Sequence, residues 1–313
     1  MTRQLFFKMG QEAAKTVIII CGPTAVGKTA VAIALAQQFK CSIISADSRQ
    51  CYKELNIGVA RPSADELKQV PHYFIASHSI QQDLTAASFE QYALEKTKLL
   101  FAKDDQVVMV GGTGLYIRAF CEGLDEIPDI DPAIRAGITE MYGAKGISWL
   151  QEQLKEKDPA FYASGEIQNP QRMMRALEVI ESTGQSIFQF QKGHKAVREF
   201  KILKIGLELP REELVERIDA RVEAMMKAGL LEEVRSLLPF KTNNALQTVG
   251  YTELIDHLEG RCTLDKAVEQ IKIHTRQYAK RQMTWFKRDT AINWFHPGNN
   301  EGMWDFLCRS LTD

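Results

Sequence analysis

The sequence predicts an α/β fold: a parallel sheet flanked by helices, with a helical insertion domain. Three observations point to it. Short apolar runs alternate with amphipathic runs through residues 1–120, which is the pattern of βαβ units. The apolar runs are continuous, as in strands that are covered on both faces. Residues 123–198 have helical patterning, so we expect them to form the insertion.

The elements of the first part of the chain follow from these runs. In order, they are the strand 16–21, the helix 30–39, the strand 42–45, the helix 87–101 and the strand 107–110. The loops that follow parallel strands lie at one edge of the sheet, where ligands bind. Residues 24–29, 46–50 and 111–116 should therefore line one crevice.

The second part of the chain is mainly helical. We expect a helix to begin at Pro170 with Asn169 as its N-cap, and to end near Gly184. The further expected elements are a strand at 201–209, a helix at 212–238 broken near Gly229, and a helix at 265–287. The expected domains are an N-terminal extension (1–15), a core (16–122 with 199–313) and the helical insertion (123–198).

Composition indicates an ordinary globular protein. Of the 313 residues, 45% are hydrophobic and 25% are charged, and the net charge of -1 argues against a uniformly basic nucleic-acid coat. No apolar run approaches the roughly 20 residues that span a bilayer, so we expect a cytoplasmic protein without membrane contact. The six cysteines form no C-x-x-C pair, and the histidines have no metal-ligand spacing.

The most informative motif lies between the first expected strand and helix. Residues 22–29, GPTAVGKT, fit the phosphate-loop pattern G-x-x-x-x-G-K-[ST]. The glycines let backbone N–H groups face inward, Lys28 adds a point charge, and the Thr29 hydroxyl can hold Mg²⁺. The helix that follows adds its positive end. The context of a strand before and a helix after predicts a P-loop NTPase-like core that binds a phosphorylated molecule.

Two further loops belong to the same crevice. Asp47 is the candidate general base, although a carboxylate there could also hold Mg²⁺ through water or cap its own turn. After the strand 107–110, many nucleotide hydrolases have a magnesium-binding Asp, whereas this chain continues Gly111, Gly112, Thr113, Gly114. The ATPase interpretation is weakened accordingly. The glycines suit either close approach to a ligand or a tight turn.

Basic residues occur at two other places. Arg217 and Arg221 are one helical turn apart, where a phosphate would relieve their repulsion; the alternative is pairing with Glu213 or other nearby acids. Residues 271–288 contain six Lys or Arg and no acid, and Arg276, Lys280 and Lys287 could follow a nucleic-acid backbone from one helix face. The alternative is a solvated helix face.

These features leave three classes of function open. The first is a group-transfer enzyme acting on RNA. The second is a small-molecule or nucleoside kinase that uses Asp47 as its base toward a hydroxyl. The third is a nucleotide-gated RNA-binding protein without chemistry. The released product separates the two enzymes, because a kinase releases ADP.

Six segments, taken together, carry a resemblance to one family. They are GPTAVGKT (22–29), SADSRQCY (45–52), VGGTGLY (110–116), NPQRMMRALE (169–178), QTVGY (247–251) and TRQYAKRQMTWFKR (275–288). In this order they resemble the tRNA dimethylallyltransferase family, also called tRNA isopentenyltransferase. The resemblance implies transfer of a dimethylallyl group from dimethylallyl diphosphate to the N6 amine of the adenosine 3′ of the anticodon.

The resemblance also implies roles for individual residues. Asp47 would be the base on the adenosine amine, Thr113 would lie in the reaction channel, and Lys28 would stabilise the leaving group, with Mg²⁺ at Thr29. The diphosphate contacts would be Gly22, Thr24, Ala25, Val26, Gly27, Lys28 and Thr29, with Arg217 or Arg221 as further candidates.

The implied partners are the tRNA anticodon stem-loop and the prenyl donor, and we expect a monomer. The implied tRNA contacts are Asp47, Ser48, Arg49, Gln50, Thr113, Arg135, Gln171, Arg172, Met173, Met174, Arg175, Gln247, Thr248, Val249, Gly250, Tyr251, Thr252, Lys280, Arg281, Gln282, Met283, Thr284, Trp285, Phe286 and Lys287. Val59, Arg61 and Thr252 stand where the family commonly has other residues.

Overall fold

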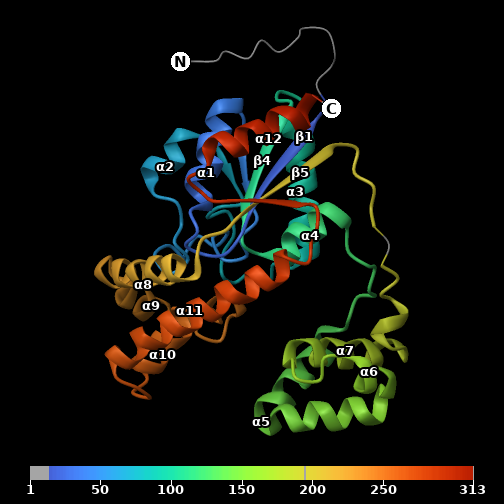
Figure 1. Cartoon of the computed structure of the whole chain (residues 1–313). Coiled ribbons are helices and arrows are strands. Elements are labelled where there is room, and N and C mark those ends of the chain that lie inside the picture. Colours follow the sequence, from blue (N-terminus) through green and yellow to red (C-terminus); the bar gives the residue numbers. More distant parts are fainter. Residues whose placement is uncertain (1–13, 194, 313) are drawn as a thin grey trace. The chain divides into compact units, whose positions relative to one another are not determined.

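A computed structural model describes residues 14–193 and 195–312, which form two compact units (Figure 1). The first unit consists of the described residues of Met1–Cys121 and Arg198–Asp313. The second is Glu122–Val197. Among the described residues, no helix is both long and apolar enough to cross a membrane. The expected N-terminal extension at 1–15 lies almost entirely outside the described residues.

The first unit is built on a parallel sheet, which confirms the predicted fold class. Its strands are β1 (Thr16–Cys21), β2 (Ile43–Ser45), β3 (His72–Tyr73), β4 (Gln106–Gly111), β5 (Lys201–Leu207) and β6 (Ile292–Phe295). Their order is β3-β2-β4-β1-β5-β6. In the central pairing, Thr16 lies opposite Gln106 and Cys21 opposite Gly111. The loops after β1, β2 and β4 therefore emerge side by side at one edge.

Apolar cores cover both faces of this sheet, because side chains alternate along each strand. Ile18 and Ile20 of β1 pack in the core formed with α1 (Lys28–Phe39) and α12 (Asn300–Thr312). Val17 and Ile19 pack in the opposite core, with α3 (Ala86–Phe101) and α4 (Gly114–Glu122). The short helix α2 (Ala64–Gln69) begins at Ser63, which forms a capping box with Glu66.

Further helices of the first unit pack together beside the core that contains Val17 and Ile19 (Figure 1). They are α8 (Arg211–Lys227), α9 (Leu230–Leu237), α10 (Tyr251–Leu258) and α11 (Leu264–Phe286), with 3₁₀ turns at Leu238–Phe240 and Asn244–Leu246. The predicted break between α8 and α9 is confirmed, because Gly229 has a φ of 97°. A left-handed residue of this kind ends one helix and allows the next to start in a new direction.

The second unit is helical, as its patterning predicted. It consists of α5 (Pro132–Lys157), α6 (Pro159–Ser164), α7 (Pro170–Thr183) and a 3₁₀ turn at Ile187–Gln189. Asn169 caps α7 by accepting a hydrogen bond from the Arg172 N–H, and Gly184 ends the helix with a φ of 70°. Leu150, Met173 and Leu177 are buried in a core of its own.

Candidate functional site

The loop between β1 and α1 has the backbone shape that binds phosphate groups. Gly22 has a φ of 138°, and a Cβ there would lie 2.5 Å from the Leu207 carbonyl oxygen of β5. Gly27, with a φ of 102°, is the N-cap of α1. Both positions require glycine, the first because the loop passes against β5 and the second because the backbone is left-handed. The loop thus curls over the N-terminus of α1, where free N–H groups attract an anion.

Lys28 lies within this loop and is bonded to its carbonyl groups. Its Nζ donates to the oxygen of Gly22 at 3.0 Å and to that of Pro23 at 2.7 Å. Burial, followed by the nearby charge of Arg221, lowers the pKa of Lys28 to about 8, while Asp47 opposes the change. A dianion beside the ammonium group would stabilise its charged form.

Asp47 follows β2 and caps the turn at 47–50. Its Oδ1 accepts hydrogen bonds from the N–H groups of Arg49 at 2.9 Å and Gln50 at 3.2 Å. The alternative role, a carboxylate that caps its own turn, is therefore present in the structure. Neither bond uses Oδ2, so the same carboxylate retains an oxygen for a substrate. The Thr113 hydroxyl accepts from the Ser48 N–H at 3.0 Å, which joins this turn to the loop after β4.

The glycines after β4 are explained by packing within the protein. A Cβ at Gly111 would lie 2.1 Å from the Ala46 carbonyl oxygen, and one at Gly112 would lie 2.2 Å from Nε2 of Gln282. A Cβ at Gly114 would meet the Trp285 ring, also at 2.2 Å. Real Cβ atoms do not approach so closely, so close packing against Ala46 and against side chains of α11 accounts for these glycines. None of the three has a positive φ, so the backbone of a tight turn does not require them.

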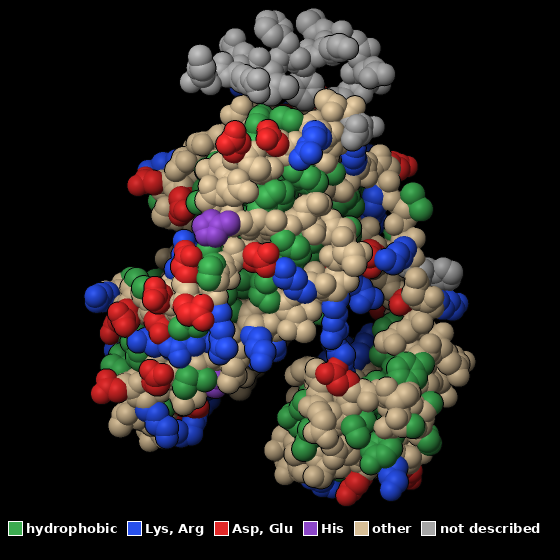
Figure 2. All heavy atoms as spheres, in the orientation of Figure 1, with side chains coloured by type: hydrophobic (Ala, Val, Ile, Leu, Met, Phe, Trp, Pro, Cys, Tyr) green, Lys and Arg blue, Asp and Glu red, His purple; other side chains and the backbone are tan. Residues whose placement is uncertain are grey.

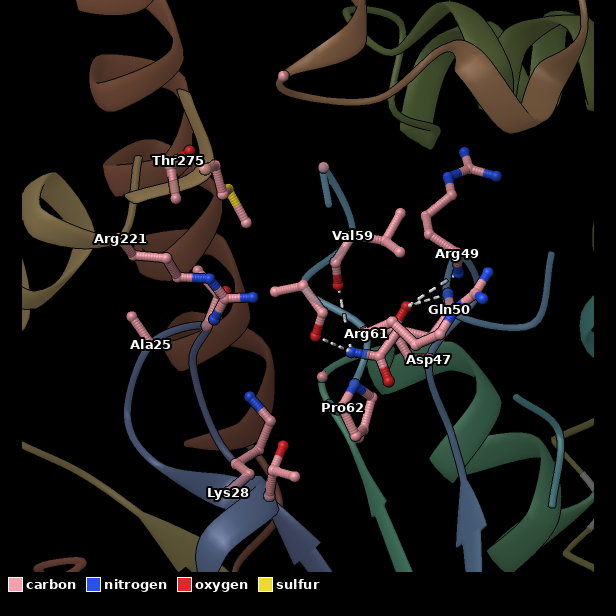
Figure 3. A pocket seen from close by; sticks show the side chains of 18 of the residues that line it. Ala25, Lys28, Asp47, Arg49, Gln50, Val59, Arg61, Pro62, Arg221 and Thr275 are labelled. Atoms are coloured by element: carbon pink, nitrogen blue, oxygen red, sulfur yellow. Dashed lines mark hydrogen bonds between the residues drawn. The ribbon is translucent and has the colours of Figure 1, made fainter. Parts of the chain in front are cut away.

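These loops enclose one cavity of about 600 Å³, lined also by residues of α8 and α11. Figure 3 shows Lys28 and Arg221 projecting into it from one side, while Asp47, Arg49 and Gln50 lie on the opposite side. Two cations therefore face a carboxylate across the cavity. This arrangement can hold an anionic leaving group at one wall and accept a proton at the other.

The two arginines of α8 have different surroundings. Arg217 forms an ion pair with Glu213 at 2.7 Å, which is the alternative that the helical spacing had left open. Arg221, by contrast, has no hydrogen-bonded or ion-paired partner among residues 14–193 and 195–312. Burial lowers the pKa of Arg221, and the charge of Asp47 opposes that change. Both arginines line the cavity, but part of the Arg217 guanidinium is bonded to Glu213, whereas all the Arg221 donors are unbonded among the described residues and thus free for an anion.

One wall of this cavity, at residues 58–62, was not predicted from the sequence. Glu233 of α9 accepts hydrogen bonds from the N–H groups of Ile57 at 2.8 Å and Gly58 at 3.1 Å, and from the Tyr251 hydroxyl at 2.6 Å. A Cβ at Gly58 would overlap the Tyr251 ring at 2.5 Å. No sequence pattern links residues so far apart, because a single carboxylate such as Glu233, on a helix with other charged residues, does not indicate which backbone groups it will bind. Tyr251, an expected RNA contact, is instead fully buried against this wall.

A second, more open cavity of about 460 Å³ adjoins the first. The two share Arg49, Thr248, Val249 and Tyr278 in their walls. The second cavity is also lined by Ser48, Gln247, Thr252, Glu253, His274, Gln277 and Arg281. Three of the segments expected to contact RNA, at 47–50, 247–252 and 280–287, therefore contribute to one opening. Tyr278 was not among the expected contacts, although its half-exposed ring lies in both walls.

The sequence model of the IPP transferase family matches residues 50–289 of this chain. A tRNA dimethylallyltransferase of Cytophaga hutchinsonii is 44% identical over 299 residues, covering 96% of this chain and 98% of the relative. One from Flavobacterium johnsoniae is 47% identical over 287 residues, covering 90% and 93%. The chain belongs to the tRNA dimethylallyltransferase family.

Solved structures of tRNA dimethylallyltransferases agree with this assignment. A full-length tRNA isopentenylpyrophosphate transferase from Bacillus halodurans is 31% identical, with a TM-score of 0.70, and the match covers 95% of this chain and 97% of that one. A eukaryotic dimethylallyltransferase acting on tRNA is 25% identical, with a TM-score of 0.72 and coverage of 95% and 78%. The fold of the chain is thus that of the family.

In this member of the family, the basic helix α11 is only partly available to a nucleic acid. Arg276 is paired with Asp219, and Lys287 with Glu208 at 2.7 Å. Acids on neighbouring segments thus pair with two members of the predicted basic face, Arg276 and Lys287, and the contact of this face with RNA stays a prediction. Figure 2 shows Lys and Arg side chains gathered, among acidic ones, over the surface of α8 to α11. Lys280 and Arg281 are exposed, whereas Gln282 and Phe286 are buried.

In the second unit, two arginines converge on one buried acid. Glu178 accepts from Arg135 at 3.1 and 3.2 Å and from Arg175 at 3.1 Å, so the cluster keeps one net positive charge. Arg172 is paired with Glu166. Met173 and Met174, expected as RNA contacts, are instead core residues with 0% and 8% exposure. A helix face that packs on a core cannot present the same side chains to RNA.

The metal expected of this family would rest on a small protein contribution. Among the residues that the structure describes, no group of three His, Cys, Asp or Glu side chains could hold a metal ion. Thr29 lines the first cavity at the start of α1. In phosphate loops Mg²⁺ is bound by the Ser or Thr hydroxyl, substrate phosphates and water, so Thr29 fits that ion, although Gly112 follows β4 where many nucleotide hydrolases add an Asp ligand.

Proposed function

We propose that the first cavity is the reaction chamber of this tRNA dimethylallyltransferase. The enzyme transfers a dimethylallyl group from dimethylallyl diphosphate to the exocyclic N6 amine of the adenosine 3′ of the anticodon, and releases diphosphate. The observation that carries the proposal is the placement of Lys28 and Arg221 across the cavity from Asp47. A diphosphate and an amine can thus occupy opposite ends of one chamber.

The diphosphate would be held by the N–H groups of residues 25–29, by Lys28 and by Arg221, since the Thr24 N–H is already bonded to Gln282. As the bond to the allylic carbon breaks, negative charge grows on the leaving oxygen, and these groups stabilise it. Mg²⁺ on the Thr29 hydroxyl and the phosphates would neutralise further charge. Arg217 would contribute its positive charge to the electrostatic potential of the site more than a direct contact, because part of its guanidinium group is bonded to Glu213.

Asp47 would accept the proton of the adenosine amine. An adenine amine is a poor nucleophile because its lone pair is delocalised into the ring, so proton removal must accompany attack. The Oδ2 atom of Asp47 is available to accept this proton, while Oδ1 accepts the two hydrogen bonds of the turn. Thr113 would maintain the position of that turn through Ser48. A base so placed contributes about 100- to 10,000-fold to a rate.

The adenosine would reach Asp47 through the second cavity. A base stacked in an anticodon loop cannot enter a chamber of this kind, so it must be extruded. Arg49, Lys280 and Arg281 would contact the adjoining RNA backbone, and Tyr278 offers an aromatic face to a base. In the second unit, Arg135, Gln171, Arg172 and Arg175 would supply further contacts. Since one chain provides the loop, the base and the cations, we propose that a monomer is active, in the cytoplasm where tRNA is found.

Nucleoside analysis of tRNA tests the proposal. The protein is incubated with labelled dimethylallyl diphosphate, Mg²⁺ and tRNA, and we expect acid-stable label in N6-dimethylallyl adenosine with one pyrophosphate released per transfer. A tRNA with guanosine at the target position is the control and should stay unlabelled. Release of ADP from ATP with a hydroxyl acceptor, and no label on RNA, would instead indicate a kinase.

A further inference from the structure

Gln282 of α11 joins three segments of the reaction chamber. Its Oε1 accepts a hydrogen bond from the Thr24 N–H of the phosphate loop at 2.8 Å. Its Nε2 donates to the Gly112 carbonyl oxygen, in the loop after β4, also at 2.8 Å. The side chain is 7% exposed, so water does not compete effectively for either bond. One amide group therefore fixes the distance between the phosphate loop and the loop that carries Thr113.

The surroundings of Gln282 are fitted to this side chain. Gly112 leaves room for it, since a Cβ there would lie 2.2 Å from Nε2. On the other side, Lys28 bonds the carbonyl oxygens of Gly22 and Pro23, the two residues before Thr24. The first three residues of the phosphate loop are therefore held by side chains of the protein. The N–H groups that follow in the loop remain available to an anion.

This geometry leaves Gln282 little free surface for the RNA contact that the resemblance implies. Both ends of its amide are bonded to backbone groups, and the side chain is buried on the side of α11 that faces these two loops. We propose that Gln282 is a positioning residue for the prenyl donor: it holds the phosphate loop in the shape that binds diphosphate. The inference rests on the proposed function in one respect, that diphosphate is the ligand of this loop.

The first test replaces Gln282 by methionine, which keeps the volume and removes both hydrogen bonds. Binding of inorganic pyrophosphate and of dimethylallyl diphosphate is measured by calorimetry, together with KM for the donor and for tRNA. We expect donor affinity to fall about tenfold, which is about 1.4 kcal/mol, and KM for tRNA to stay within about twofold. Gln270→Met, at a half-buried position on the same helix outside both cavities, is the matched control and should change neither value.

The second test uses the contact between Gln282 and Gly112. Gly112→Ala alone should weaken pyrophosphate binding about tenfold, because the added methyl group displaces the glutamine amide. Gln282→Ala should have a similar effect. The double variant should bind no more weakly than Gln282→Ala, since the displaced group is already absent. Losses that simply add would overturn the inference, because they would mean that the two residues act separately.

The outcomes distinguish this inference from the proposed function. If the unmodified protein binds no pyrophosphate, the proposed ligand of the loop is wrong, and the inference is overturned with it. If the unmodified protein binds pyrophosphate and Gln282→Met binds it equally well, the inference alone is overturned. An equal rise in KM for donor and tRNA would also overturn it, because that result indicates a general weakening of α11.

Discussion

Replacing Asp47 by asparagine separates the two roles that the structure gives this side chain. Oδ1 accepts hydrogen bonds from the N–H groups of Arg49 and Gln50 at 2.9 and 3.2 Å, and an amide oxygen in the same place can accept both. Asp47→Asn therefore retains the turn and removes the base. Asp47→Ala removes both, so the pair of variants distinguishes chemistry from folding.

The expected magnitudes follow from these contacts. Loss of a general base lowers the rate about 100- to 10,000-fold, equivalent to about 2.7–5.5 kcal/mol of transition-state stabilisation. Both variants should show this loss. The alanine variant also loses two turn hydrogen bonds, each worth about 0.5–1.5 kcal/mol, so it should melt at a lower temperature than the asparagine variant.

Single-turnover transfer of labelled donor, with both substrates saturating, is the assay. Donor and tRNA affinity are measured separately, and tRNA affinity should stay within about tenfold. Donor binding should weaken slightly at pH values near the pKa of Lys28, because Asp47 raises the pKa values of Lys28 and Arg221 and thereby stabilises their charged forms. An asparagine variant that turns over within about threefold of the unmodified enzyme would refute the role of Asp47 as the base.

Three further predictions concern the cations. Arg221→Met should weaken donor binding about 10- to 100-fold, which is the value of a charge-assisted hydrogen bond. Arg217→Met should change donor binding by less than about threefold, because that side chain is exposed and already paired. Equal effects of the two variants would contradict the distinction between the two arginines. Since the pKa of Lys28 is lowered to about 8, the free enzyme loses this charge as the pH rises through that value, so donor affinity should fall between about pH 7.5 and 9 in calorimetry. Lys28→Met should bind more weakly and lack this fall; a persisting fall would assign it to another group. Neutralising Lys280 and Arg281 together should weaken binding of every substrate tRNA and reduce the slope of its salt dependence by about one unit per lost phosphate contact. The control, Lys266→Gln on the same helix, should change neither quantity. An unaltered slope would mean that this part of α11 is a solvated face without RNA contacts.

The sequence alone determined the core of the fold. The continuous apolar run at 16–21 and the phosphate-loop motif fix one strand, one loop and the start of one helix, because local backbone preferences and burial act on neighbouring residues there. The cap at Asn169, the helix end at Gly184 and the break at Gly229 were predicted for the same reason. The family followed from six short segments in a fixed order.

Elements with weak local signals were not predicted. The strand β3 has two residues and β6 has four, one of them the exposed Asn293, so the apolar runs of both are shorter than those that identify a buried strand. Their places in the sheet depend on pairing with β2 and β5, which are distant in sequence. Long-range pairing is a tertiary property, and hydrophobic periodicity does not encode it.

At the site, the sequence provided the groups, and the tertiary structure decided what each of them faces. Arg217 and Arg221 look equivalent in the sequence and both line the cavity, yet Arg217 pairs with Glu213, while Arg221 has no ion pair among the described residues. Gln282 belongs to a basic segment but is bonded to two loops, at Thr24 and Gly112. The physical reason is that burial and hydrogen-bond partners depend on packing between segments far apart in the chain, which no local pattern records.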